Sequence, residues 1–521
     1  MMDIKKILPF TKSNDDQYFE KVNYKVHNYK ALSTKTDVTV VIPVYNAEEY
    51  LAKTIDSVIV QNIGFSKITM ILIDDGSNDK SRTILKRYAE LYSNIVVVFL
   101  DENTGTPSFP RNLGAHLANS KYLTFLDADD WLAHDGIKHL YQVLESTKCD
   151  YAVGKTIQVN AKSEKIIGKY ESCKNRTNVS PFSIPHIFYH LGPRARMMRL
   201  SFIKKNKIRF PEMKYAEDKQ FFIDVLTSVG KISTTTASIY YLNRIPGNDS
   251  LTKQTDIIEK MDTNIAVLKY VLDKKLKIEE EKMIVNRLVE FDSITRLFNR
   301  KHFVTSSQKQ LYYEAFEQVV NVFNSYERPY SLEEIIKKPL NKAFFKFLTN
   351  KQHTNVQSLA EWSTEGGEES RTLNNGLPYT LAHLKNGESV LMEIPVEARV
   401  IREEAKEDLI KFEIELTGHH IPKIQSIEFK SRSSAIKTFT AAKPLTQKKN
   451  RLDVKIKAGH LKNLQRGGYV IYLIYDDYES VMISKESDAA YELKSSKKMY
   501  NFYQTINGNL SIKVKKVQAT Q

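Results

Sequence analysis

Between residues 38 and 130, four apolar runs alternate with segments of helical spacing. The runs are VTVVIPVY (38–45), ITMILIDD (68–75), NIVVVFLD (94–101) and KYLTFLDADD (121–130). Continuous apolar runs are typical of strands that are covered on both faces. Strands that alternate with helices predict a mostly parallel sheet in an α/β layer fold. Ligands of such sheets bind at the carboxyl ends of the strands, which is where the polar residues of this segment gather.

The α/β domain is expected to span residues 38–255, after an N-terminal extension over residues 1–37. The extension is polar with weak periodicity, so we expect it to pack on the following domain or to be partly disordered. Residues 256–360 carry helical periodicity with mixed charges and predict a helical region.

The last part of the chain predicts a different fold class. The polar, glycine-rich stretch 361–376 is expected to be a linker or an exposed loop. Beyond it, apolar residues alternate along the segment DLIKFEIELTG, which indicates a strand with one buried face. Further segments of this kind predict an all-β module over residues 376–521, and we expect an immunoglobulin-like sandwich.

Composition limits the partners and the location that we expect. The 521 residues carry a formal net charge of +15, which favours an anionic partner such as nucleic acid, anionic lipid or another polyanion. The two cysteines form no C-x-x-C motif, as expected in a reducing cytosol. We find no signal peptide and no apolar stretch of the roughly 20 residues that cross a bilayer. We therefore expect a cytoplasmic protein whose membrane contact, at the inner face, would be peripheral.

The fourth strand ends in an acidic cluster, Asp127, Asp129 and Asp130. Side chains two residues apart on a strand project to the same face, so Asp127 and Asp129 can aim at one point. Paired hard oxygen donors suit Mg²⁺ or Mn²⁺, which would relieve the repulsion between the carboxylates. Solvated acids in a turn, or a cap on the next helix, would explain the same residues without a metal.

The other strand ends add polar residues to the same edge of the sheet. Asp75 could accept hydrogen bonds from a base or ribose, although an Asx-rich turn explains it equally well. Arg111 could pair with a phosphate or with Asp127, or form a structural salt bridge. Tyr45 could flank a base or simply pack.

In this order the motifs closely resemble the family 2 glycosyltransferases of the GT-A fold. The resemblance implies that the nucleotide-sugar site is formed by Pro43, Tyr45, Asp75, Asn103, Arg111 and Asp127. It also implies that Asp129 binds the metal, and that Asp249 or Ser250, in a loop that closes the site, contacts the diphosphate or the metal, with Asp249 the candidate metal ligand.

A second motif, MKYAEDKQFFIDVL, places Glu217 and Asp218 at a predicted helix start. Acids there often only interact with the helix dipole. By the same resemblance, Asp218 is the general base and Glu217 a supporting or acceptor-binding residue. A positioned carboxylate can take the proton of an acceptor hydroxyl as it attacks the sugar carbon.

The basic run 192–211 directly precedes this motif and contains Arg194, Arg196 and Arg199. A solvated basic face is the ordinary explanation, but cations beside an acceptor site would attract a polyanionic chain. The run offers only Phe202 and Phe210 as stacking aromatics, which argues against nucleic acid.

The chain also resembles one subgroup, the poly(ribitol-phosphate) β-N-acetylglucosaminyltransferases of wall teichoic acid. The shared motifs are DDGSND, NTGTPSFPRN, LDADD and RFPEMKYAEDKQFF, with a helical and then β tail. The resemblance implies a UDP-N-acetylglucosamine or UDP-glucose donor, an anionic poly(ribitol phosphate) acceptor and a possible homotrimer. We therefore expect a metal-dependent inverting glycosyltransferase. The alternative is a capsular or lipid-linked glycan acceptor, and a scaffold with an inactive transferase domain is a further hypothesis.

Overall fold

A computed structural model of the chain describes residues 18–19, 21–245, 257–433, 438–441 and 445–517. The chain divides into two compact units. The first comprises residues 1–162, 166–288 and 317–328, and the second comprises 163–165, 289–316 and 329–521. We describe each unit by itself.

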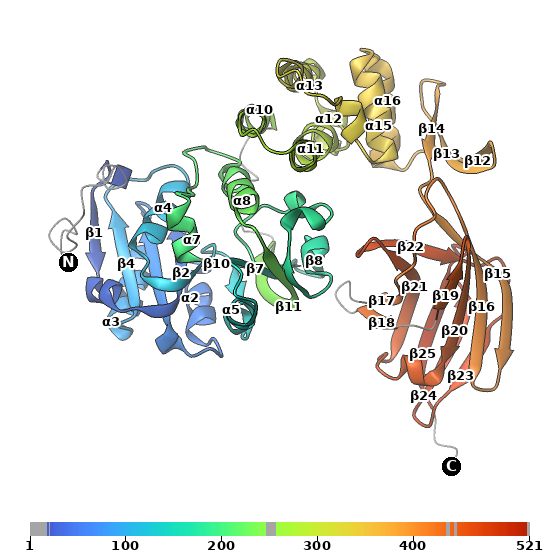
Figure 1. Ribbon diagram of the computed structural model, residues 1–521, viewed down its shortest axis with the longest axis horizontal. Helices are drawn as coiled ribbons and strands as arrows, with labels where there is room; N and C mark the ends of the chain where they lie inside the picture. Colours follow the sequence, from blue (N-terminus) through green and yellow to red (C-terminus); the bar gives the residue numbers. More distant parts are fainter. Residues whose placement is uncertain (1–17, 20, 246–256, 434–437, 442–444, 518–521) are drawn as a thin grey trace. The chain divides into compact units, whose positions relative to one another are not determined.

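The first unit is built on a mixed sheet, ordered β1-β4-β3-β2-β5-β10-β7-β11-β6 (Figure 1). These strands are β1 (Tyr24–His27), β2 (Thr36–Val44), β3 (Ile68–Asp74), β4 (Ile95–Leu100), β5 (Ser120–Phe125), β6 (Trp131–Leu132), β7 (Tyr151–Val159), β10 (Arg196–Arg199) and β11 (Ile232–Asn243). Strands β4, β3, β2 and β5 are parallel, as the sequence predicts. Strand β8 (Glu164–Ile167) pairs with β7, and strand β9 (Arg176–Val179) pairs with β11.

Helices connect these strands, and two further helices follow β11. They are α2 (Leu51–Ile59), α3 (Ser81–Leu91), α4 (Ser108–Leu117), α5 (Gly136–Thr147), α6 (Lys169–Ser172), α7 (Leu200–Lys205), α8 (Glu217–Ser228), α10 (Ile257–Asp273) and α11 (Ile278–Asn286). Part of the N-terminal extension joins the sheet, because β1 pairs antiparallel with the edge of β4.

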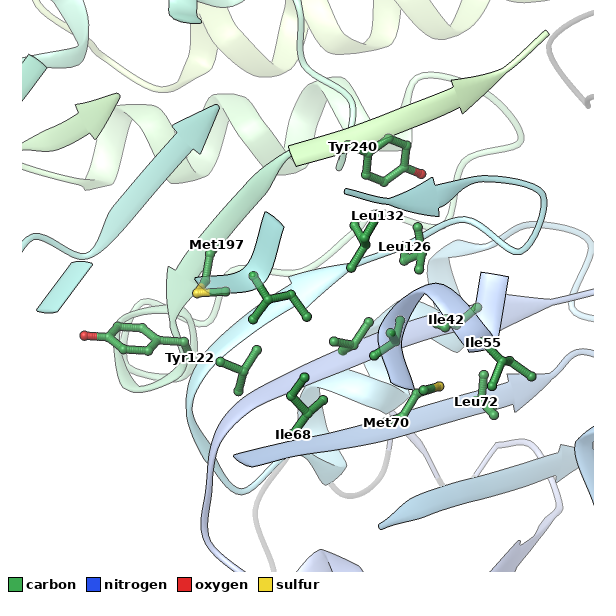
Figure 2. Packing of buried hydrophobic residues seen from close by; sticks show 14 of the residues in the cluster. Ile42, Ile55, Ile68, Met70, Leu72, Tyr122, Leu126, Leu132, Met197 and Tyr240 are labelled. Carbon is green, nitrogen blue, oxygen red and sulfur yellow. The ribbon is translucent and has the colours of Figure 1, made fainter. Parts of the chain in front are cut away.

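The core of this unit explains why the apolar runs become strands. Every residue of β3 and β4 is buried, so both faces of these strands are covered. Residues of these strands form a buried apolar cluster, and helix α2 packs Leu51, Ile55 and Val58 into it (Figure 2). Helix α4 approaches β2 so closely that a Cβ on Gly114 would lie 2.4 Å from Val41 Cγ1. This contact fixes α4, and with it Arg111, over the sheet.

The second unit begins with helices and ends in β structure. Its helical part contains α12 (Lys301–Thr305), α14 (Leu332–Ile335), α15 (Pro339–Thr349) and α16 (His353–Glu365); the π-helix η6 (Arg287–Thr295) and α13 (Lys309–Asn324) each run across the division between the units. A small sheet follows, formed by β12 (Glu369–Asn374), β13 (Leu377–His383) and β14 (Ser389–Glu393). The linker expected at 361–376 is therefore wrong in part: its first residues complete α16, and β12 pairs antiparallel with β13.

The predicted all-β module is confirmed. Its strands are β15 (Glu397–Lys406), β16 (Leu409–Thr417), β17 (Ser426–Ser431), β18 (Thr438–Ala441), β19 (Leu445–Lys448), β20 (Arg451–Lys457), β21 (Gly467–Tyr475), β22 (Glu479–Ser484), β23 (Tyr491–Lys494), β24 (Lys498–Gln504) and β25 (Leu510–Lys516). Strand β16 shows the expected alternation, since Ile410, Phe412, Ile414 and Leu416 are all buried. Among the described residues, no helix has the length and apolar character that a membrane span requires.

Candidate active site

Arg111 joins three acids from two parts of the chain in the first unit. Its Nη2 donates to Asp127 Oδ1 at 2.8 Å, and its Nη1 donates to Glu217 Oε1 at 3.1 Å and Asp218 Oδ1 at 2.9 Å. Asp127 follows the carboxyl end of β5, and the other two acids begin α8. The structure therefore brings together four of the predicted site residues, which we call the Arg111 cluster: Arg111, Asp127, Glu217 and Asp218.

The acids of this cluster differ in exposure from their arginine. The Arg111 side chain is 5% exposed, whereas Asp127 and Asp218 keep 24% and 28% of their side-chain surface. Ala216, just before α8, has a left-handed backbone with φ of 69°, which turns the chain into the helix. Acids in the first turn of a helix also interact favourably with its dipole.

Burial and charge move the pKa values of these acids in different directions. Burial, and then the charge of Asp218, raises the pKa of Glu217 to about 7. Burial also raises the pKa of Asp218, against the opposing effect of Arg111. For Asp127, Arg111 and Arg194 outweigh burial and hold the pKa below its ordinary value. One acid is thus kept charged while its neighbours are moved toward the pH range in which a carboxylate works as a base.

Asp130, the third acid of the D-A-D-D sequence, has a structural function. It is buried, and its Oδ2 accepts a hydrogen bond from Tyr240 Oη at 2.7 Å while its Oδ1 accepts one from the Asn243 amide at 2.7 Å. The Thr54 hydroxyl donates to the carbonyls of Ala128 and Asp130. These contacts fix the turn that carries Asp127 and Asp129.

Few of the described side chains near the Arg111 cluster could bind a metal ion. Among the described residues, no group of three or more His, Cys, Asp or Glu side chains is arranged to hold a metal ion. Asp127 and Asp129 offer hard carboxylate oxygens, and Mg²⁺ is commonly bound by one or two carboxylates plus phosphate oxygens and water. The residues present fit such an ion if the donor substrate supplies the remaining oxygens. Asp249 and Ser250 lie outside the described residues.

The predicted nucleotide residues lie at the ends of β2, β3 and β4. Asp75 is buried and accepts hydrogen bonds from both the amide and the hydroxyl of Thr104. Burial raises the pKa of Asp75 to about 6, although Thr104 opposes the shift. Tyr45 is 51% exposed, and Asn103 Oδ1 accepts from the Gly105 amide in the turn that presents Thr104.

The three predicted acceptor-binding arginines do not share one environment. Arg196 is buried, and all five of its N–H donors are used by protein groups, so the structure does not support an acceptor-binding role for it. Arg199 pairs with Asp150 at 2.7 Å and lies over the ring of Tyr122. The charge of Arg194 acts on both Asp127 and Asp218, and that of Arg196 acts on Asp218 as well.

The sequence analysis missed several residues that shape the site. Thr54 and Tyr240 support the acidic turn, and Thr104 is the partner of Asp75. The only local signal was Thr104 in the N-T-G turn. Two surface hollows, of about 600 and 480 Å³, lie elsewhere, lined mainly by α5 and by residues around Asp37 and Lys121. We therefore locate the site by the chemistry of its side chains.

Comparison with known proteins gives the class of the chain. The family model described as Glycosyl transferase family 2 matches residues 39–207. An uncharacterized glycosyltransferase of Haemophilus influenzae is 32% identical over 203 residues, which cover 37% of this chain and 72% of that protein. The chain belongs to the family 2 glycosyltransferases.

Two relatives carry more specific names. A poly(ribitol-phosphate) beta-glucosyltransferase of Bacillus spizizenii is 32% identical over 206 residues, covering 39% of this chain and 32% of the relative. The poly(ribitol-phosphate) beta-N-acetylglucosaminyltransferase TarP of Staphylococcus aureus is 33% identical over 210 residues, covering 39% of this chain and 62% of TarP. This chain thus matches less than two thirds of the length of either protein. The sequence-based resemblance is confirmed by these two matches.

The fold extends the similarity to both units of the chain. The crystal structure of S. aureus TarS aligns with a TM-score of 0.56 and 17% identity, covering 93% of this chain and 86% of TarS. The α/β domain is therefore GT-A-like, and it is followed by a helical and then a mostly β region.

Proposed function

We propose that this protein is a metal-dependent inverting glycosyltransferase. It moves N-acetylglucosamine or glucose from a UDP-sugar to a ribitol hydroxyl of poly(ribitol phosphate), as in wall teichoic acid. The observation that carries the proposal is the Arg111 cluster, in which a D-x-D acid and an E-D acid pair share one guanidinium. The names of the two poly(ribitol-phosphate) relatives support the donor and the acceptor.

In the proposed reaction Asp218 is the general base. Its carboxylate takes the proton of the ribitol hydroxyl while that oxygen attacks the anomeric carbon. The bond from the anomeric carbon to the UDP oxygen breaks on the opposite face, so the configuration inverts and UDP leaves. Arg111 holds Asp218 in place through their ion pair, and it pairs with Glu217 through the same nitrogen.

The donor side of the site is assigned to the strand ends. Asp75 accepts a hydrogen bond from the base or ribose, Tyr45 flanks the base, and Pro43 and Asn103 complete the pocket. Asp127 and Asp129 would hold Mn²⁺ or Mg²⁺, which, when bound, would neutralise charge on the departing diphosphate.

The proposal leaves Arg194 as the cation that faces the acceptor side. We further propose a cytoplasmic location at the inner membrane face and a homotrimer, as the family resemblance implies. Light scattering of the purified chain would test the trimer directly.

The test is a UDP-release assay with purified protein. We expect release only when UDP-sugar, Mn²⁺ or Mg²⁺ and poly(ribitol phosphate) are all present, and a panel of nucleotide sugars would identify the donor. Activity that falls with rising salt would support a polyanionic acceptor. Equal activity on a neutral glycan, without this salt dependence, would contradict the proposed acceptor.

A further inference from the structure

A buried network surrounds Arg196, and none of its residues belongs to the Arg111 cluster. Its Nη2 donates to Glu171 Oε2 at 3.0 Å, and its Nε donates to Tyr151 Oη at 2.5 Å. The other oxygen of Glu171 is 2.6 Å from His190 Nδ1. Glu171, His190 and Arg196 are all buried, so the pairing satisfies charges that would be costly alone.

The remaining donors of Arg196 bind the backbone of one loop. They contact the carbonyl oxygens of His190, Gly192 and Arg194, the last at 2.9 Å. Three carbonyls at alternate positions are thus tied to one rigid guanidinium. The next residue, Ala195, has a left-handed φ of 57°, a conformation that costs a non-glycine residue energy and persists where the surroundings enforce it. The network therefore fixes the path of residues 190–195.

The side chain that this loop presents is Arg194. Its Nε is buried, and among the residues that the structure describes, none accepts a hydrogen bond from it. The guanidinium lies directly over Gly192, where an added Cβ would come within 2.7 Å of Arg194 Nη2. Its charge acts on Asp127 from the D-x-D turn and on Asp218 from α8. A buried donor without a protein partner is uncommon in folded proteins, and a bound ligand is one group that can accept its hydrogen bond.

We propose that Arg194 binds a phosphate group of a substrate, and that the network of Glu171, His190 and Arg196 positions it for that contact. A guanidinium can form two parallel hydrogen bonds with a phosphate group. The inference rests on the proposed function and deepens it. Two sources share this chemistry: the diphosphate of the donor and the phosphodiester of the acceptor.

The experiment measures binding directly, so that it does not depend on turnover. UDP and poly(ribitol phosphate) are each titrated into wild-type protein and into Arg194→Ala, with thermal melting as the check on folding. We expect Arg194→Ala to lower the affinity for one of the two ligands by about tenfold or more, since charge-assisted hydrogen bonds are lost. Weaker UDP binding would identify the donor diphosphate, and weaker polymer binding the acceptor.

Two further variants sharpen this test. Lys205→Ala removes an equal charge from the exposed end of α7 and should change neither affinity. Gly192→Ala should displace the Arg194 guanidinium and shift the same affinity in the same direction by less. If Arg194→Ala leaves both affinities within twofold of wild type, the proposal is overturned, even if transfer itself is confirmed. If wild-type protein shows no transfer, the proposed function fails separately.

The positioning role of the network needs its own readout. Arg196→Lys keeps the charge but supplies three donors in place of five, so it should release the loop carbonyls. As a single substitution, it should lower the affinity for the ligand that Arg194→Ala affects. Combined with Arg194→Ala, it should lower that affinity no further. Equal losses in both backgrounds would show a merely structural role and overturn the positioning claim. Glu171→Gln serves as a second network variant if Arg196→Lys does not fold.

Discussion

Arg111 and Arg196 are both buried arginines that pair with glutamate or aspartate, but their surroundings differ. Arg111 pairs with three carboxylates, two of which keep about a quarter of their surface exposed. Arg196 pairs with one fully buried carboxylate and otherwise binds neutral protein oxygens. The first arrangement holds partly exposed carboxylates together, and the second holds backbone in place. Of these two arginines, only Arg111 has carboxylate partners that solvent and a substrate can reach.

The largest effect should come from removing Arg111. Arg111→Met would leave three carboxylates without their common partner, which costs about 3–5 kcal/mol for breaking a buried pair. We expect both a large fall in the free energy of unfolding and a loss of transfer, measured by denaturant unfolding and UDP release. A variant that remains as stable and as active as wild type would show that the Arg111 cluster does not organise the site.

Removing Arg196 should lower the free energy of unfolding about as much as removing Arg111 does. It should lower the kcat for transfer less. Arg196→Met would break the buried ion pair with Glu171, which keeps its contact with His190, and breaking a buried pair costs about 3–5 kcal/mol. Assayed at low temperature, where the folded form persists, this variant should keep its kcat for transfer while its substrate affinity falls. Loss of kcat equal to that of Arg111→Met would remove the distinction between the two arginines.

A smaller effect is expected at Asp75, which we propose to bind the nucleotide. Its pKa of about 6 lies above the ordinary value, so protonation stabilises the fold at low pH and this contribution is lost as the pH rises through 6. Ligand binding should have the opposite dependence, because only the carboxylate accepts hydrogen bonds at both oxygens. Uridine affinity, which involves no titrating phosphate, should therefore decline below about pH 6.

The control for Asp75 is its amide variant. Asp75→Asn should bind uridine weakly and with no such pH dependence, while its melting temperature near pH 7 should be unchanged or higher. Uridine affinity that is flat with pH in wild-type protein would argue against Asp75 as a nucleotide ligand.

The smallest effect should come from Tyr240, which supports the acidic turn. Tyr240→Phe removes the hydroxyl that donates to Asp130 and accepts from the Asp127 amide. The expected loss is about 1–3 kcal/mol of stability, with a modest fall in kcat. Tyr241→Phe is the matched control, since its ring stacks on Trp131 and should tolerate the change. Equal effects from both variants would contradict this account of the turn.

The sequence predicts the elements of the first unit better than the contacts between them. Buried strands such as β3 are visible as continuous apolar runs, because both faces need apolar side chains. The acids at the strand ends are visible for the same reason, since they interrupt those runs. The pairing of Arg111 with Asp218 spans 107 positions, and nothing local in the chain indicates it.

The basic run shows where composition is misleading. Its many cations suggest a solvated face, yet the segment R-M-M-R forms β10 between β5 and β7. Met197 and Met198 are fully buried there, and Arg196 is drawn into the same layer because Glu171 lies opposite. The two methionines were the available signal. Glu171 could not have been paired with Arg196 from the sequence, since it lies on a short helix with no distinguishing pattern.

The most direct test of the central claim is the rate of UDP release by Asp218→Asn. Asp224→Asn makes the same chemical change further along α8, where the carboxylate pairs with Tyr270 and Lys274, and serves as the control. With donor, metal and polymer present, we predict a fall in kcat of about 10²–10⁴-fold for Asp218→Asn, with UDP binding retained. Wild-type turnover in that variant would contradict the assignment of the base and the account of the site built on it.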